Sequence, residues 1–72
     1  MRAVPLPLIP LYVLRQGTWY NLASAADKRS NVYHGGIGHR SDDAARYTRS
    51  EADSWLRLYP KMVIEFAGFA LA

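Results

Sequence analysis

The sequence predicts an α+β domain in which a small three-stranded antiparallel sheet carries one main helix on one face. Two observations lead to this prediction. A β-rich stretch near the N-terminus is interrupted by Gln16-Gly17, as in a hairpin, and a later segment joins a helix-capping motif to an apolar stripe of helical period. The chain has 72 residues, which allows a single domain over residues 1–72.

The N-terminal third is expected to be extended and then to form the hairpin. Residues 1–10 form a proline-rich lead-in, because each proline fixes its own φ and disfavours helix in the residue before it. Residues 11–15 (LYVLR) are apolar on both faces, which is typical of a central strand. Gly17 then supplies positive φ for a tight turn into a second strand at residues 18–22.

The connection over residues 23–40 has no sustained period. Its start favours a helical turn, its middle is polar turn material, and Val32-Tyr33 fits a short extra strand. The glycine-rich stretch from His34 to His39 is typical of a flexible turn, and long connections of this kind tend to be functional or mobile. Ser41 followed by two aspartates predicts a helix start and one short helical turn over residues 42–47.

The main helix is predicted over residues 49–58. Thr48 and Glu51 match a capping box, and Pro60 ends the helix. Its apolar residues fall on one stripe, whereas the charged residues on the opposite face have i, i+4 spacing and are able to pair. The stripe consists of Ala52, Trp55, Leu56 and Tyr59, and the charged face of Arg49, Asp53 and Arg57.

Residues 61–67 predict a third strand, with Met62, Ile64 and Phe66 on one face and Glu65 on the other. Residues 68–72 (GFALA) form a short apolar tail that either packs or stays loose. The simplest sheet has the strand order 2-1-3, all antiparallel, with or without the short extra strand. The expected core consists of Trp55, Leu56, Val13 or Leu11, Ile64 and Phe66.

Composition argues against catalysis, metals and membranes. The two histidines are too few for a zinc site, and no phosphate loop, dinucleotide fingerprint or nucleophile elbow is present. We therefore expect no enzyme, no catalytic residue, no metal and no cofactor. The apolar run over residues 3–14 is shorter than the roughly 20 residues that span a bilayer, so no membrane association is expected. Ala23-Ser24-Ala25 has the form of a signal-peptide cleavage site, but the segments before it do not fit a signal peptide.

The formal charge is +3, and seven of the nine cations are arginines, which suit multi-point contacts with carboxylate or phosphate. The strands and the helix stripe are needed for the core, which leaves the 23–40 connection and nearby arginines for recognition. The predicted binding residues are Arg29, Tyr33, Arg40, Arg46, Arg49 and Arg57.

Three segments together resemble many small proteins encoded by bacteriophages and prophages. They are the hairpin with Tyr12-Val-Leu-Arg15 and Trp19-Tyr20, the stretch Ala45-Arg46-Tyr47-Thr48 leading to Trp55-Leu56, and the closing strand Met62-Val-Ile-Glu65. This broad class includes anti-CRISPR proteins and inhibitors of host RNA polymerase.

The resemblance implies a small phage-borne binder of host machinery that works in the cytoplasm of a bacterial host cell. The first expected function is an anti-CRISPR protein that binds a host protein or ribonucleoprotein complex and blocks nucleic-acid binding or nuclease recruitment. The alternatives are a phage regulator that binds host RNA polymerase and a direct nucleic-acid-binding protein. The oligomeric state and the identity of the partner stay open.

Overall fold

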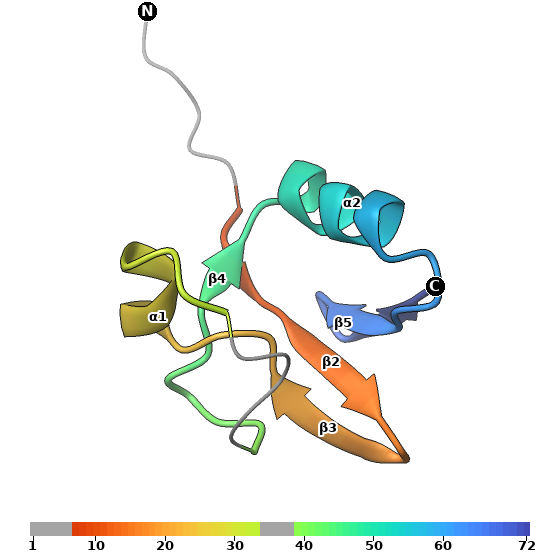
Figure 1. The fold of residues 1–72 in the computed structure, drawn as a ribbon, viewed down its shortest axis with the longest axis horizontal. Helices are drawn as coiled ribbons and strands as arrows, with labels where there is room; N and C mark the ends of the chain where they lie inside the picture. The colour runs from red at the N-terminus through yellow and green to blue at the C-terminus, as the bar shows by residue number, and fades with distance from the viewer. Residues whose placement is uncertain (1–6, 34–38) are drawn as a thin grey trace, which may run out of the picture.

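A four-stranded antiparallel sheet in the order β3-β2-β5-β6 organises the fold, and the larger helix α2 lies across one of its faces (Figure 1). A computed structural model describes residues 7–33 and 39–72 of the chain. The α+β class and the antiparallel sheet are confirmed, and the predicted order 2-1-3 corresponds to β3-β2-β5. The strands of this sheet are β2 (Tyr12–Arg15), β3 (Thr18–Asn21), β5 (Ile64–Phe66) and β6 (Phe69–Leu71).

The fourth strand is formed by the C-terminal residues, for which the sequence left packing open. β6 pairs with β5 in the register Ile64↔Leu71 and Phe66↔Phe69. The turn between them places Ala67 at φ 53° and Gly68 at φ 85°. Two successive residues at positive φ define the tight hairpin turn whose twist matches that of the flanking strands.

The turn of the first hairpin has the same form. Gln16 lies at φ 52° and Gly17 at φ 78°, so the predicted role of Gly17 is confirmed and Gln16 shares it. β2 pairs with β3 from Tyr12↔Asn21 to Arg15↔Thr18. β2 is thus an interior strand, as its apolar character predicted, together with β5.

Helix α2 (Arg49–Leu58) begins with the predicted capping box. Thr48 Oγ1 accepts from the backbone N–H of Glu51 at 3.2 Å, and Glu51 Oε1 accepts from the backbone N–H of Thr48 at 2.9 Å. The two bonds satisfy backbone donors that would otherwise be orphaned at the helix start. The helix ends at Leu58, before Pro60, as expected.

The helical turn predicted over residues 42–47 does not form: Asp42 and Asp43 make a single reverse turn, closed by the Ala44 N–H and the Ser41 carbonyl at 3.3 Å, and long-range backbone bonds hold residues 44–47 extended. The Ala45 N–H donates to the Ala23 carbonyl at 2.8 Å, and the Ala45 carbonyl accepts from the Leu11 N–H at 3.2 Å. The segment continues into β4 (Arg46–Tyr47), which pairs with β1 (Ile9–Pro10) in a second, two-stranded sheet. Residues 43–47 therefore lie between two other segments of the chain instead of coiling on themselves.

Ser41 is likewise not a helix cap. Its hydroxyl accepts from Asn21 Nδ2 at 2.9 Å and its N–H donates to Asn21 Oδ1 at 3.1 Å. Asn21 is buried, so these two bonds satisfy a polar side chain that would be costly to leave unpaired. Through these two hydrogen bonds, Ser41 holds the chain that follows the 23–40 connection against β3.

The connection itself contains one short helix, α1 (Ala25–Arg29), with Ser24 as its N-cap. This agrees with a helical turn near residue 23, although Asp27 to Arg29 belong to the helix and not to a turn. Val32 and Tyr33 do not form the suggested extra strand. The glycine-rich residues 34–38 and most of the lead-in, residues 1–6, lie outside the described residues.

The core is centred on Leu11, Tyr47 and Ile64, which are almost fully buried. Ala52 of α2 is also fully buried and brings the helix close to the sheet. Of the predicted core residues, Leu11, Val13 and Ile64 are buried, but Trp55, Leu56 and Phe66 are only partly buried and pack against the cluster from outside. The core is smaller than the sequence predicted, and Tyr47, which was not among the predicted core residues, is its largest member.

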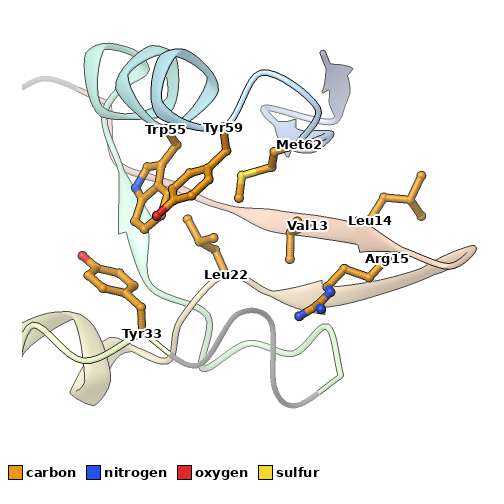
Figure 2. Close-up of a pocket in the computed structure, with 8 residues that line it drawn as sticks. All are labelled: Val13, Leu14, Arg15, Leu22, Tyr33, Trp55, Tyr59 and Met62. Atoms are coloured by element: carbon orange, nitrogen blue, oxygen red, sulfur yellow. The ribbon is translucent and has the colours of Figure 1, made fainter.

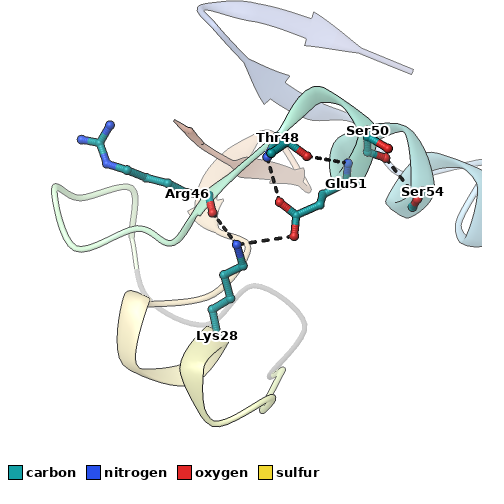
Figure 3. A network of polar contacts seen from close by, with 6 residues as sticks. All are labelled: Lys28, Arg46, Thr48, Ser50, Glu51 and Ser54. Atoms are coloured by element: carbon teal, nitrogen blue, oxygen red, sulfur yellow. Dashed lines mark hydrogen bonds and ion pairs between the residues drawn. The ribbon is translucent and has the colours of Figure 1, made fainter. Parts of the chain in front are cut away.

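One lysine ties the two helices to β4 (Figure 3). Lys28 Nζ donates to the Arg46 carbonyl at 2.6 Å and lies 3.5 Å from Glu51 Oε2. The same ammonium group sits 4.2 Å from the centre of the Tyr47 ring. Because these contacts come from α1, β4 and the start of α2, Lys28 fixes α1 against the rest of the fold.

Candidate aromatic binding groove

The predicted arginines do not gather into one surface. Arg40 Nη1 donates to Glu65 Oε2 at 2.7 Å, and its guanidinium lies 4.4 Å from the centre of the Tyr12 ring. These contacts hold the segment around Arg40 against the sheet. Its charge is neutralised within the molecule, so Arg40 acts first as a structural residue.

The helix arginines are also engaged locally. Arg49 Nε donates to Asp53 Oδ1 at 3.0 Å, which confirms the predicted i, i+4 pair. Arg57 does not join this pair, because its Nη2 donates to Ser54 Oγ at 3.0 Å. An exposed pair of this kind stabilises a helix only slightly, by about 0.3–0.5 kcal/mol.

The remaining two arginines lie on α1 and β4. Arg29 is exposed in the last turn of α1, and Arg46 is exposed on β4 with its Nη1 3.4 Å from the Leu8 carbonyl. The five predicted arginines are exposed, but they occur on separate elements with separate partners, and their role in binding stays a prediction. The sixth predicted residue, Tyr33, has a different environment.

Tyr33 forms one wall of an open groove beside the C-terminal half of α2 (Figure 2). Trp55 of α2 and Tyr59, the residue that caps the end of this helix, continue the same wall. The groove has a volume of about 460 Å³. This is within the range of about 300–1,000 Å³ that is typical of ligand pockets.

The three rings pack against one another at the groove wall. Tyr33 meets Trp55 edge-on, with centroids 4.9 Å apart and ring planes at 70°. Trp55 and Tyr59 are near-parallel, with centroids 5.8 Å apart and planes at 21°. Tyr33 is 41% exposed and Tyr59 is 53% exposed, so much of this aromatic surface faces solvent.

The groove floor is aliphatic. Val13, Leu22 and Met62 line it from β2, from the end of the first hairpin and from the segment before β5. Val13 and Leu22 are buried members of the core, so the floor is held by the same packing that stabilises the fold. A rigid apolar floor beneath exposed aromatic rings is suited to receiving a side chain from another molecule.

Among the described residues that line the groove, Arg15 is the only charged one. It lies at the end of β2, and Figure 2 shows its guanidinium group turned back toward Val13. Within residues 7–33 and 39–72 it has neither a hydrogen bond nor an ion pair with another side chain. Arg15 differs in this respect from Arg40 and Arg49, which are paired with acids.

A buried hydroxyl lies behind the Tyr33 wall. Tyr47 is 1% exposed, and its hydroxyl finds no hydrogen-bond partner of suitable geometry among the described residues. Burial is the main cause that raises the pKa of Tyr47, and the neighbouring Tyr33 hydroxyl and the Glu51 carboxylate raise it further. The Tyr47 side chain is therefore neutral at physiological pH, and it links the core to the groove wall.

Two further features bear on the expected chemistry. Within the described residues, no three histidine, aspartate or glutamate side chains come close enough to hold a metal ion, while His34 lies outside them. Among the same residues, no helix has the length and apolar character needed to cross a membrane. The absence of metal, cofactor and catalysis stays a prediction.

Comparison with known proteins found no match to a protein-family model, to a curated protein or to a solved structure. The groove geometry is thus the basis for a functional proposal. Of its residues, sequence reasoning selected Tyr33 and assigned Trp55 to the core. It placed Tyr59 on the core-facing stripe and did not select Arg15, for which the available signals were an aromatic residue just before the helix-ending Pro60 and a lone cation at the end of an apolar strand.

Proposed function

We propose that this protein is a small non-enzymatic binding protein that docks on a partner protein through the groove of Tyr33, Trp55, Tyr59 and Arg15. The observation that supports this most is the exposure of the aromatic wall. Aromatic rings and arginine are the side chains most enriched at the energetic centres of protein interfaces. A core centred on Leu11, Tyr47 and Ile64 leaves these rings available for another molecule.

The charge distribution favours protein over nucleic acid as the partner. Tracking a phosphate backbone requires several cations along one path. Here Arg40 and Arg49 are paired with acids, Lys28 is committed to Glu51, and Arg29 and Arg46 lie on other elements. One unpaired cation in the groove fits a single anionic group better than a phosphate chain.

The resemblance to phage-encoded inhibitors suggests which partners to test first. An anti-CRISPR protein of the blocking kind would cover a functional surface of a host complex, which requires a rigid docking site and no catalysis. A regulator of host RNA polymerase would use the same site on a different partner. Direct binding of nucleic acid is the third function, in which bases would stack on the rings beside Arg15.

Affinity capture with matched variants tests the proposal. The immobilised protein is exposed to nuclease-treated lysate of a bacterium with an active CRISPR system, alongside Tyr59→Ala and the control Arg49→Ala. Tyr59 is half exposed, so its removal is expected to leave the fold intact. We expect one partner to be retained by the wild type and by Arg49→Ala but not by Tyr59→Ala.

Salt and infection assays separate the alternatives. Raising the salt from about 50 to about 200 mM weakens phosphate-dominated binding by roughly 10³-fold or more, whereas groove docking should change little. Phage plating on a CRISPR-immune host then tests inhibition, which Tyr59→Ala should abolish. Capture that is unaffected by Tyr59→Ala and Tyr33→Ala would place the site elsewhere. Capture that occurs from untreated lysate but not from nuclease-treated lysate would favour nucleic acid.

A further inference from the structure

Arg15 lies beside an apolar groove and has no acidic partner among the residues that the structure describes. The other residues that line the groove are aromatic or aliphatic. Two other arginines, by contrast, are paired with acids: Arg40 with Glu65 at 2.7 Å and Arg49 with Asp53 at 3.0 Å. Within the described part of the molecule the guanidinium group of Arg15 is therefore open to an anionic group of a ligand.

The guanidinium group restricts what that anionic group is. Its planar set of donors binds a carboxylate through two parallel hydrogen bonds, and it is always charged at physiological pH. A carboxylate placed beside Val13 and the rings would be partly shielded from water, which strengthens its attraction to the cation. The groove thus offers an apolar surface and a carboxylate-binding group side by side.

Resting on the proposed function, we propose that the groove recognises an extended segment of the partner in which an acidic side chain adjoins an aromatic or aliphatic one. The apolar side chain lies over the floor of Val13 and Met62, against Trp55 and Tyr59. The carboxylate meets Arg15. A volume of about 460 Å³ accommodates one or two side chains, which fits a short linear segment and not a large domain surface.

A pair of small probes isolates the role of the carboxylate. Indole-3-propionate and indole-3-propionamide share the same ring and differ only in the charged group. Their binding is followed by amide and indole N–H chemical shifts in two-dimensional NMR spectra of the labelled protein. A ligand of this size is expected to bind with a Kd on the order of 1 mM.

Charge recognition by Arg15 predicts that the acid binds about fivefold more tightly than the amide. In Arg15→Gln the two compounds should bind equally, at the affinity of the amide. Arg57→Gln, an exposed arginine of α2 outside the groove, should keep the fivefold preference. Since Arg15 is exposed, Arg15→Gln should melt at the same temperature as the wild type.

Several results would overturn this inference. Equal binding of acid and amide to the wild type would remove the carboxylate preference, as would a preference that survives in Arg15→Gln. Tighter binding of uridine monophosphate than of indole-3-propionate would point to nucleotide recognition. No shift with either probe at about tenfold the expected Kd would also count against the inference. Each of these is separate from a failure of the proposed function, which would appear as partner capture that does not depend on Tyr59.

Discussion

Replacing Tyr47 by phenylalanine is expected to stabilise the protein, although Tyr47 is the largest fully buried side chain. A buried hydroxyl without a hydrogen-bond partner costs roughly 1–3 kcal/mol. The nearby Tyr33 hydroxyl offsets part of this cost, so we expect a gain of about 1 kcal/mol. The ring stays in place, and with it the contact to Lys28 Nζ at 4.2 Å.

Thermal unfolding followed by circular dichroism at neutral pH measures this change. A gain of about 1 kcal/mol should raise the Tm by about 4–8 °C in a domain of this size. Tyr59→Phe is the matched control, because its hydroxyl is on a side chain that is 53% exposed, and its Tm should not move. A lower Tm for Tyr47→Phe would refute the reasoning by showing that the hydroxyl makes a stabilising hydrogen bond, with Tyr33 as the first candidate partner.

The buried Tyr47 hydroxyl also predicts how the stability of the protein changes at alkaline pH. Burial raises the pKa of Tyr47 above its ordinary value of 10.0, so the folded state holds this proton more tightly than the unfolded state does. Tyr47 therefore adds no pH dependence below pH 10, and the stability of the fold falls as the pH rises above that value and the unfolded state loses this proton first. Tyr47→Phe should therefore show a flatter decline of Tm above pH 10 than the wild type.

Three further changes test the helix cap and the second hairpin by thermal unfolding. Thr48→Ala removes the cap of α2 and should cost about 1 kcal/mol, and an unchanged Tm would show that the cap is dispensable. The backbone N–H of Thr48, and to a smaller extent the Lys28 ammonium group, lowers the pKa of Glu51 below its ordinary 4.5. The stabilisation that the Glu51 carboxylate provides is therefore present above pH 4.5 and is lost as the pH falls below it. Glu51→Gln should lose less Tm at acid pH than the wild type, and an equal loss of Tm would contradict this role of Glu51. Ala67→Asn should raise stability by about 0.5–1 kcal/mol because asparagine tolerates positive φ better than alanine, and a loss would contradict the turn assignment.

The sequence predicted best those elements that are determined by neighbouring residues. Thr48 and Glu51 are three positions apart, and their reciprocal bonds form as the motif predicted. Gly17 likewise acts through its own backbone conformation, which no distant residue needs to supply. In both cases the deciding interaction lies within one turn of the chain.

Elements decided by distant partners were predicted wrongly. Ser41 and the aspartates after it carry strong local signals for a helix start, but the segment gains more from bonds to other strands. The buried Asn21, 20 positions away, takes both polar groups of Ser41. The backbone of Ala45 is bonded on both sides, to Ala23 and to Leu11. Two long-range hydrogen bonds and a satisfied buried amide outweigh a helix propensity that is at most a few tenths of a kcal/mol per residue.

The candidate site could not be predicted from the sequence for a related reason. A prediction from residue types alone assumes that each arginine is unpaired and that each residue of an apolar helix stripe is buried. Arg40 is neutralised by Glu65, 25 positions away, and no sequence spacing reveals that pair. Along the stripe of α2, burial decreases from Ala52, which is fully buried, through the half-buried Trp55 to Tyr59, which is 53% exposed. The last turn of the helix therefore stands away from the sheet, and the space beneath it is the groove. A stripe of helical period predicts which face of a helix turns inward, but the length of sheet beneath it decides where the core ends and a binding surface begins.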